Sequence, residues 1–124
     1  MKRHMDLIRD VSIFAEGQDE HWFAAQIEIE GWDQKAIVYH VGLAIDAGFL
    51  DGKDESSLSG REFYVLGLTY YGHEFLHQIR SDNVWTKLRA LAKEQGIDLT
   101  VDLVKRLAPK VAFPKRTSKV SMRS

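Results

Sequence analysis

The sequence predicts one domain of the α+β class. Its 124 residues and 14.2 kDa match the size of an ordinary single domain. A hydrophobic fraction of 44% and a charged fraction of 28% are typical of a globular chain. Segments with helical periodicity alternate with segments rich in aromatic and β-branched residues. We expect a folded domain over residues 1–112 and a basic, flexible tail over residues 113–124.

The first two elements follow from apolar spacing. Apolar residues at helical spacing predict a helix from Met5 to Glu16, and Gly17 ends it. The next segment alternates apolar and polar residues with a period of two, which predicts a half-buried strand. The apolar members of that strand are Ala25, Ile27 and Ile29.

A second helix and a β-hairpin come next. Asp33 is a good N-cap for a helix from Gln34 to Ala47, and Gly48 terminates it. Phe49 and Leu50 begin an extended segment, and the turn-forming run DGKDESSLSG after Leu50 predicts a surface loop. The aromatic and branched residues between Arg61 and Leu68 predict the returning strand of the hairpin.

Three further helices complete the predicted fold. Thr69 can cap a helix that reaches Arg80, and Ser81 or Asp82 can cap one from Asn83 to Gln95. A last helix opens at Thr100, and we expect Pro109 to stop it because an interior proline lacks a backbone donor and clashes with the preceding turn.

Composition excludes several kinds of chemistry. With no cysteine, the chain has no disulfide, thiolate metal site or cysteine nucleophile. Its glycines do not have the spacing of a phosphate-binding loop, and its histidines have no triad-like context. No apolar run is long enough to cross a bilayer, and the first ten residues lack a signal-peptide core. We therefore expect a cytoplasmic, non-enzymatic protein that uses no cofactor and binds no membrane.

One metalloprotease-like motif stands apart. His73, Glu74 and His77 match H-E-x-x-H, in which two histidines one helical turn apart bind zinc and the glutamate activates water. Glu94 or Asp98 could be proposed as a third ligand. However, the motif opens a short amphipathic helix directly after a turn, with its histidines on the side expected to face solvent. We interpret it as two surface histidines that could bind nickel or zinc adventitiously.

The net charge of −1 hides an asymmetry along the chain. Seven basic residues and no acidic residue follow Asp102. The rest of the chain therefore holds ten basic and eighteen acidic residues, a net charge of −8. A basic end on an acidic body suggests an anionic partner, although it can equally be a solubilising tail.

The element order is that of a winged helix-turn-helix-like domain with a C-terminal helical extension. YHVGLAIDAGFL, from Tyr39 to Leu50, resembles the recognition helix and first wing strand of small bacterial winged-helix regulators. GLTYYGHEFL, from Gly67 to Leu76, resembles the turn that leads from their second wing strand into the next helix.

These segments, with the opening MKRHMDLIRD and the run GLTYYGHEFLHQIRSDNVW, resemble the bacterial and phage family known as domain of unknown function 2513. The resemblance reaches to about Ala108. It implies a winged-helix-like fold in a phage or mobile-element setting, with DNA binding and transcription regulation inferred from that fold. Because a fold does not fix a function, the site needs a separate argument.

A DNA-binding winged helix would place the helix from Gln34 to Ala47 in the major groove of double-stranded DNA. We expect its outer face to carry Lys35, Tyr39, Gly42 and Asp46, with His40 to one side. The opposing charge of Asp46 and the acidic residues of the wing weaken this expectation. The candidate DNA-binding residues are Gln34, Lys35, Tyr39, His40, Lys53, Arg61, Lys115, Arg116 and Lys119.

The alternative is a protein-interaction or phage accessory module that keeps the fold without reading DNA. Tyr39, Leu43 and Ala47 would then form part of a surface for a protein partner or a homodimer. An exposed Leu43 facing another subunit would favour this alternative, whereas a positive surface around Lys35, Arg61 and the tail would favour DNA.

Overall fold

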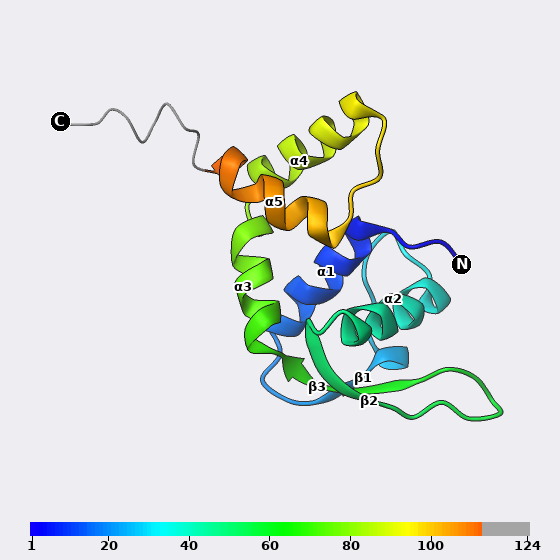
Figure 1. The fold of residues 1–124 in the computed structure, drawn as a ribbon. Coiled ribbons are helices and arrows are strands. Elements are labelled where there is room, and N and C mark those ends of the chain that lie inside the picture. Colours follow the sequence, from blue (N-terminus) through cyan, green and yellow to red (C-terminus); the bar gives the residue numbers. More distant parts are fainter. Residues whose placement is uncertain (113–124) are drawn as a thin grey trace. The chain divides into compact units, whose positions relative to one another are not determined.

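The computed structural model describes residues 1–112 and contains five α-helices and one three-stranded antiparallel sheet within that range (Figure 1). The fold is therefore α+β, as the sequence predicts. The chain forms two compact units, one from Met1 to Leu76 and one that begins at His77. The boundary between them falls within helix α3.

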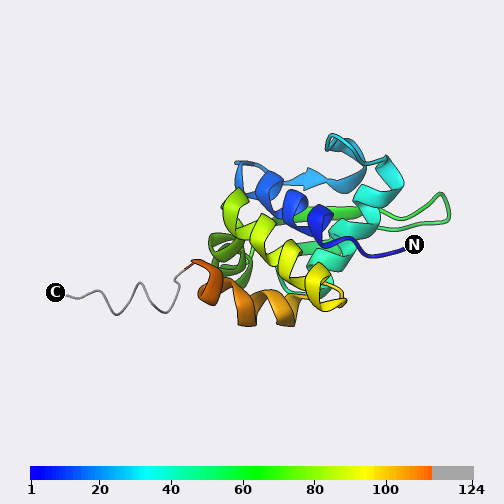
Figure 2. The ribbon, with the colours of Figure 1, turned by 90° about the horizontal axis from the view of Figure 1, so that it is seen from above.

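The N-terminal unit is built on the sheet. Helix α1 (Met5–Glu16) precedes strand β1 (Trp22–Phe23), and helix α2 (Gln34–Asp46) precedes the hairpin of β2 (Leu50–Asp54) and β3 (Phe63–Leu68). The strand order is β1-β3-β2, so the last strand lies between the other two. Figures 1 and 2 show α1 and α2 on the same side of this sheet.

The core of this unit lies between those two helices and the sheet. Both helices contribute apolar stripes, and the sheet contributes one face, since Trp22 pairs with Val65 and both are buried. The ring of Phe49 stacks on that of Phe75 with centroids 4.2 Å apart. The largest apolar side chains fully buried in this core are those of Leu7, Val11, Ile37, Val41, Phe49, Val65 and Leu76.

One predicted strand is wrong. Residues 24–26 form a short 3-10 turn, η1 (Ala24–Gln26), and the strand lies earlier, at Trp22–Phe23. Apolar alternation also occurs when a turn buries every second or third side chain. Here Ala24 and Ile27 are buried and Ala25 is exposed. The period of two therefore does not continue through the segment.

Two further predictions need correction. The segment predicted as loop after Leu50 is partly strand, since β2 continues to Asp54 with a bulge between Asp51 and Gly52. Gly42 does not lie on the outer face of α2. It is buried, and a Cβ atom there would come within 2.7 Å of the Phe63 ring. A glycine at this position lets the helix approach the sheet closely.

The C-terminal unit contains the end of α3 (Tyr70–Ile79), α4 (Asp82–Gln95) and α5 (Val101–Ala112). The predicted caps are confirmed at three helix ends. The hydroxyl of Thr69 accepts a hydrogen bond from the Gly72 N–H, and the hydroxyl of Ser81 accepts one from the Val84 N–H. Gly96 follows α4 in the left-handed conformation, with φ of 69°.

The prediction that Pro109 stops the last helix is wrong, because α5 continues through Pro109 to Ala112. Pro109 lies on the exposed side of the helix. The opposite side is buried through Leu103, Val104 and Ala108. Burial of this apolar side stabilises the helix over a position that local propensity disfavours.

Candidate nucleic-acid interface

Helix α2 is held at both ends by local interactions. The carboxylate of Asp33 accepts a hydrogen bond of 2.8 Å from the Ala36 N–H at its start. At its end, Gly48 has a φ of 85°, which turns the chain directly into β2. The helix and the hairpin that follows it therefore form one continuous element on which the candidate residues lie.

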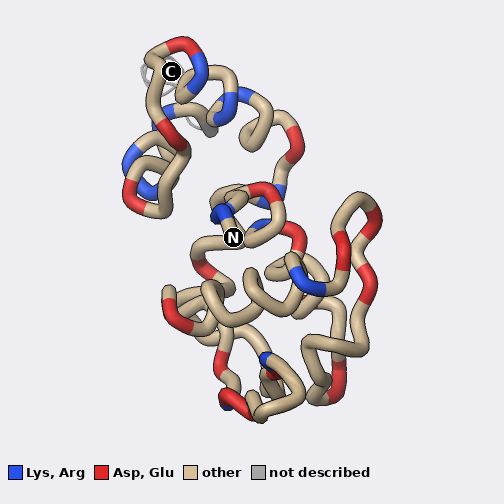
Figure 3. Tube along the Cα trace, turned by 90° about the vertical axis from the view of Figure 1, so that its right-hand side faces the viewer, with Lys and Arg blue, Asp and Glu red and all other residues tan. Residues whose placement is uncertain are grey.

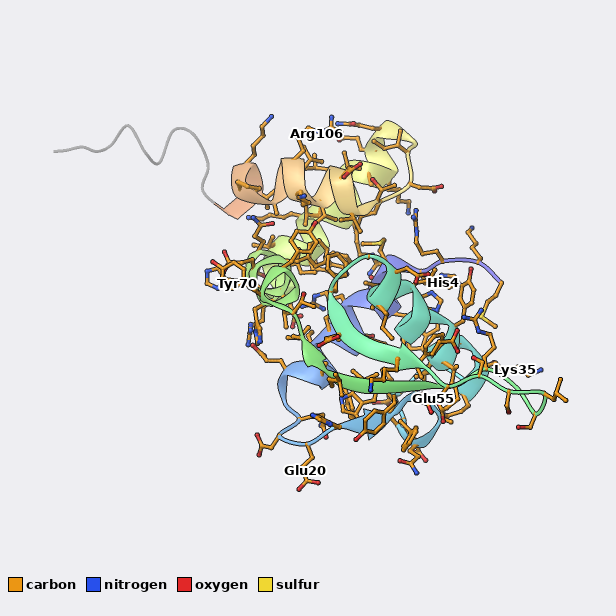
Figure 4. All side chains as sticks on the ribbon, turned by 60° about the horizontal axis from the view of Figure 1, so that its bottom comes forward. His4, Glu20, Lys35, Glu55, Tyr70 and Arg106 are labelled. Carbon is orange, nitrogen blue, oxygen red and sulfur yellow. The ribbon has the colours of Figure 1, made fainter. Side chains whose placement is uncertain are left out.

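Of the four candidate residues on α2, only Lys35 is a basic residue that is exposed. Lys35 is exposed on the first turn (Figure 4), and Tyr39 is half-buried with its ring at 77° to that of His40. Two carboxylates, Asp33 and Asp46, are exposed at the ends of the same helix. The exposed face of α2 therefore carries one basic side chain among the candidates and acidic groups at both ends.

His40 is not available to DNA, which corrects the prediction for this residue. Its side chain is fully buried, at 0% exposure. Its Nε2 accepts a 2.8 Å hydrogen bond from the His4 N–H, so the proton resides on Nδ1, which donates to the Ala36 carbonyl at 2.8 Å. Burial lowers the pKa of His40 from its ordinary value; the Ala36 carbonyl opposes this shift and His4 adds to it. His40 is a structural residue.

Gln34 is also occupied by the fold. Its side-chain amide donates to the carbonyl of Ile27 at 2.9 Å and to the carbonyl of Ala24 at 3.2 Å. Both amide hydrogens are therefore used to hold the segment that follows η1 against the start of α2. Gln34 is an exposed polar residue, as the DNA-binding prediction requires. Its side-chain amide nevertheless bonds to residues that lie seven and ten positions earlier in the chain.

The hairpin carries the two other described basic candidates. Lys53 is exposed on β2 opposite Tyr64, and the guanidinium of Arg61 lies 5.1 Å from the centroid of the Phe63 ring. Hydrogen bonds from Ser56 lower the pKa of Asp54, and the charge of Arg61 contributes to the same shift. The other charged residues of the hairpin are acidic: Asp51 and Glu55 are exposed, and Glu62 is half-buried.

Sequence reasoning missed the tip of this hairpin. Leu58 is fully exposed there. Backbone hydrogen bonds of 2.9 and 3.0 Å join Ser57 and Gly60, and the hydroxyls of Ser57 and Ser59 lie 2.8 Å apart. The tip therefore has a defined conformation that presents one apolar side chain. The turn-forming residues of this segment predicted a surface loop, but they did not indicate which hydrogen bonds order its tip.

A second missed feature is the outer face of the sheet. The rings of Phe23 and Tyr64 lie 4.8 Å apart, and Nδ1 of His21 lies 3.2 Å from the Tyr64 hydroxyl. Asp19 and Glu20 line a shallow hollow beside them. Glu20 is labelled in Figure 4. This face combines aromatic rings with the acidic groups of Asp19 and Glu20 and with Lys53, which pairs with Tyr64.

The surface suggested as the alternative is only partly exposed. Ala47 is exposed, whereas Tyr39 and Leu43 are half-buried. Leu43 therefore does not stand out from α2 as an apolar anchor. The basic candidates Lys115, Arg116 and Lys119 lie outside the described residues.

The H-E-x-x-H motif lies on α3, where His73, Glu74 and His77 are all exposed. Within residues 1–112, no group of three or more His, Asp or Glu side chains is placed to hold a metal ion. In the same part of the chain, no helix has the length and apolar character needed to cross a membrane.

Charge is strongly divided between the two units. Residues 1–76 contain six basic and fourteen acidic residues, a net charge of −8, and the remaining residues contain eleven basic and four acidic residues, a net charge of +7. Acidic residues accordingly prevail along the N-terminal unit in Figure 3. The unit that contains α2 and the hairpin is therefore the acidic one.

Comparisons with known proteins identify the family. The model of the family described as hypothetical protein (DUF2513) matches residues 2–98. An uncharacterised protein of Haemophilus influenzae is 36% identical over 109 residues, which cover 87% of this chain and 92% of the relative. No solved structure matches the chain. With a match across most of its length to both the family model and this relative, the chain belongs to the DUF2513 family.

Proposed function

We propose that this protein is a small, non-enzymatic winged-helix protein that binds double-stranded DNA in a regulatory role. The observation that carries the proposal is the connectivity of the N-terminal unit. A helix precedes β1, a second helix leads directly into a hairpin, and the strand order is β1-β3-β2. This is the arrangement expected of a winged helix, in which the helix before the wing enters the major groove. A phage or mobile-element setting belongs to the same proposal.

The N-terminal unit departs from that arrangement in one respect. A helix-turn-helix pair needs a helix before the recognition helix, and here the segment between β1 and α2 holds only the short η1 turn. Hydrogen bonds from the Gln34 amide to the carbonyls of Ala24 and Ile27 hold this segment, where a winged helix would use the packing of a helix. The α2–hairpin element is therefore the part that the proposal uses.

A second candidate function is a protein-interaction module, and one observation favours it. The N-terminal unit has a net charge of −8, which repels phosphate, and its hairpin tip presents the fully exposed Leu58. Burial of this exposed apolar side chain against a partner protein would contribute favourable free energy. The partner in this second candidate function could also be another copy of the chain, bound through the same hairpin tip.

Fluorescence anisotropy of the full chain with a labelled 20–25 base-pair duplex of random sequence, at about 25 to 200 mM KCl, tests the proposal. We expect binding that weakens steeply with salt, since counterion release dominates non-specific DNA affinity. Absence of binding at the lowest salt would contradict DNA binding. A Leu58→Ser variant in sedimentation or pull-down experiments then tests the interaction candidate.

A further inference from the structure

The C-terminal helix α5 has a basic exposed face. Lys105, Arg106 and Lys110 are all exposed, whereas Leu103 and Val104 are buried on the other side. Arg106 and Lys110 are four residues apart and lie on one side of the helix, and Lys105 lies at the edge of the same exposed side, away from the apolar stripe. We call Lys105, Arg106 and Lys110 the basic face of α5. The side chain of Arg106 is labelled in Figure 4.

The described part of the C-terminal unit, residues 77–112, contains seven basic and four acidic residues, a net charge of +3. The exposed Asp102, in the first turn of α5, lies on the same side of the helix, three and four residues before Lys105 and Arg106, and it is the last acidic residue of the sequence. The neighbouring helix α4 adds the exposed residues Lys87, Arg89 and Lys93 against Asp82 and Glu94. Four more basic residues follow in the sequence, outside the described residues. A surface of this sign attracts polyanions, and its affinity depends on salt.

The acidic unit offers no comparable surface. Its exposed basic candidates, Lys35, Lys53 and Arg61, stand among the carboxylates of α2 and the hairpin. Helix α2 and the hairpin therefore lie in the acidic unit, and most of the basic residues lie in the C-terminal unit.

We infer that the basic face of α5 contacts the phosphate backbone of duplex DNA and supplies most of the protein's electrostatic DNA affinity. This inference rests on the proposed function. Such contacts hold a protein on DNA without reading its sequence, since phosphates are the same at every base pair. Any sequence preference would then come from α2 or the wing, at low intrinsic affinity.

Two matched triple variants of the full chain test the inference. K105Q/R106Q/K110Q removes the basic face of α5, and K35Q/K53Q/R61Q removes three positive charges from the acidic unit. Each variant changes the net charge by the same amount, and all six side chains are exposed. Circular dichroism and thermal melting establish that both variants keep the wild-type fold. The variant K105R/R106K/K110R keeps the charge and should bind like the wild type.

In the duplex anisotropy assay, we expect the α5 triple variant to lose about tenfold or more in affinity at low salt and to lower the salt slope by about two to three. The control triple variant should lose less than about threefold. Equal losses, a larger loss in the control, or an α5 variant that binds like the wild type would overturn the inference. If the wild-type chain itself does not bind, the proposed function fails, which is a different result from any of these.

Discussion

The backbone N–H of His4 donates a 2.8 Å hydrogen bond to Nε2 of the buried His40. The two rings are stacked with centroids 5.8 Å apart, and the ring of Trp32 lies 5.0 Å from that of His4. This bond needs a neutral imidazole, because a protonated Nε2 cannot accept a hydrogen bond. The N-terminal residues are therefore tied to α2 through a group whose charge state matters.

This arrangement predicts a pH-dependent stability. Burial lowers the pKa of His40 in the folded chain below 6.5, so the unfolded chain takes up the proton first as the pH falls. The stability that the neutral His40 contributes should be complete above about pH 6.5, and the free energy of unfolding should decrease below that pH. One proton limits the slope to about 1.4 kcal/mol per pH unit. Urea unfolding between pH 7.5 and 5 measures this slope.

A His40→Gln variant should flatten this pH dependence, since it removes the titrating group. The matched control is His21→Gln, which removes an exposed histidine and should leave the slope as in the wild type. An unchanged slope in His40→Gln would show that other groups cause the pH dependence.

A substitution of Gln34 tests whether this residue stabilises the fold. Truncation to alanine removes both donors to the Ala24 and Ile27 carbonyls, and Ala24 is fully buried. We expect Gln34→Ala to lower the free energy of unfolding by about 1–3 kcal/mol. Lys35→Ala, at the adjacent exposed position, should change it by less than about 0.5 kcal/mol. Chemical denaturation of both variants provides the comparison, and wild-type stability in Gln34→Ala would refute the structural role.

The sequence predicted best what is determined by neighbouring residues. Asp33, Thr69 and Gly96 mark helix ends because a cap acts within one turn of the chain. The hairpin was predicted for the same reason. The alternation at residues 25–29 predicted a strand wrongly, because periodicity alone cannot distinguish a strand from a turn that buries Ala24 and Ile27.

The candidate site was less predictable because its residues are defined by distant partners. Gln34 and His40 have the composition of a reading helix, yet the fold uses both side chains internally. Nothing in the local sequence indicates that His4 approaches His40 across 36 positions. The charge asymmetry was visible in the sequence, and the structure adds that Lys105, Arg106 and Lys110 share an exposed helix face.

Gly72 allows α3 to pass close to the start of the sheet. A Cβ atom at this position would lie 2.1 Å from the Phe49 carbonyl oxygen, and backbone cannot move aside as a flexible side chain can. We expect Gly72→Ala to destabilise the fold by about 3 kcal/mol through overpacking. Gly17→Ala is the control, since its Cβ would meet only the Phe14 carbonyl at 3.6 Å, an ordinary contact. Thermal unfolding followed by circular dichroism distinguishes them; equal melting temperatures would disprove the close approach.

Pro109 gives the last prediction. It lies inside α5 with three helical residues after it, on the exposed side, while Val104 and Ala108 are buried. Proline in a helix interior is about 3 kcal/mol less favourable than alanine, and less so near an end. Pro109→Ala should therefore raise the free energy of unfolding of the unit containing α5 by about 1 kcal/mol.

The measurement for Pro109→Ala is hydrogen exchange of the α5 amides, which reports local opening of this helix directly. Protection should increase from the preceding turn to the end of the helix. Lys110→Ala, at the next exposed position, should leave protection nearly unchanged. A fall in protection in Pro109→Ala would mean that the proline ring makes a stabilising contact. In that case the continuation of α5 past Pro109 would depend on packing by the proline and not only on burial of the apolar stripe.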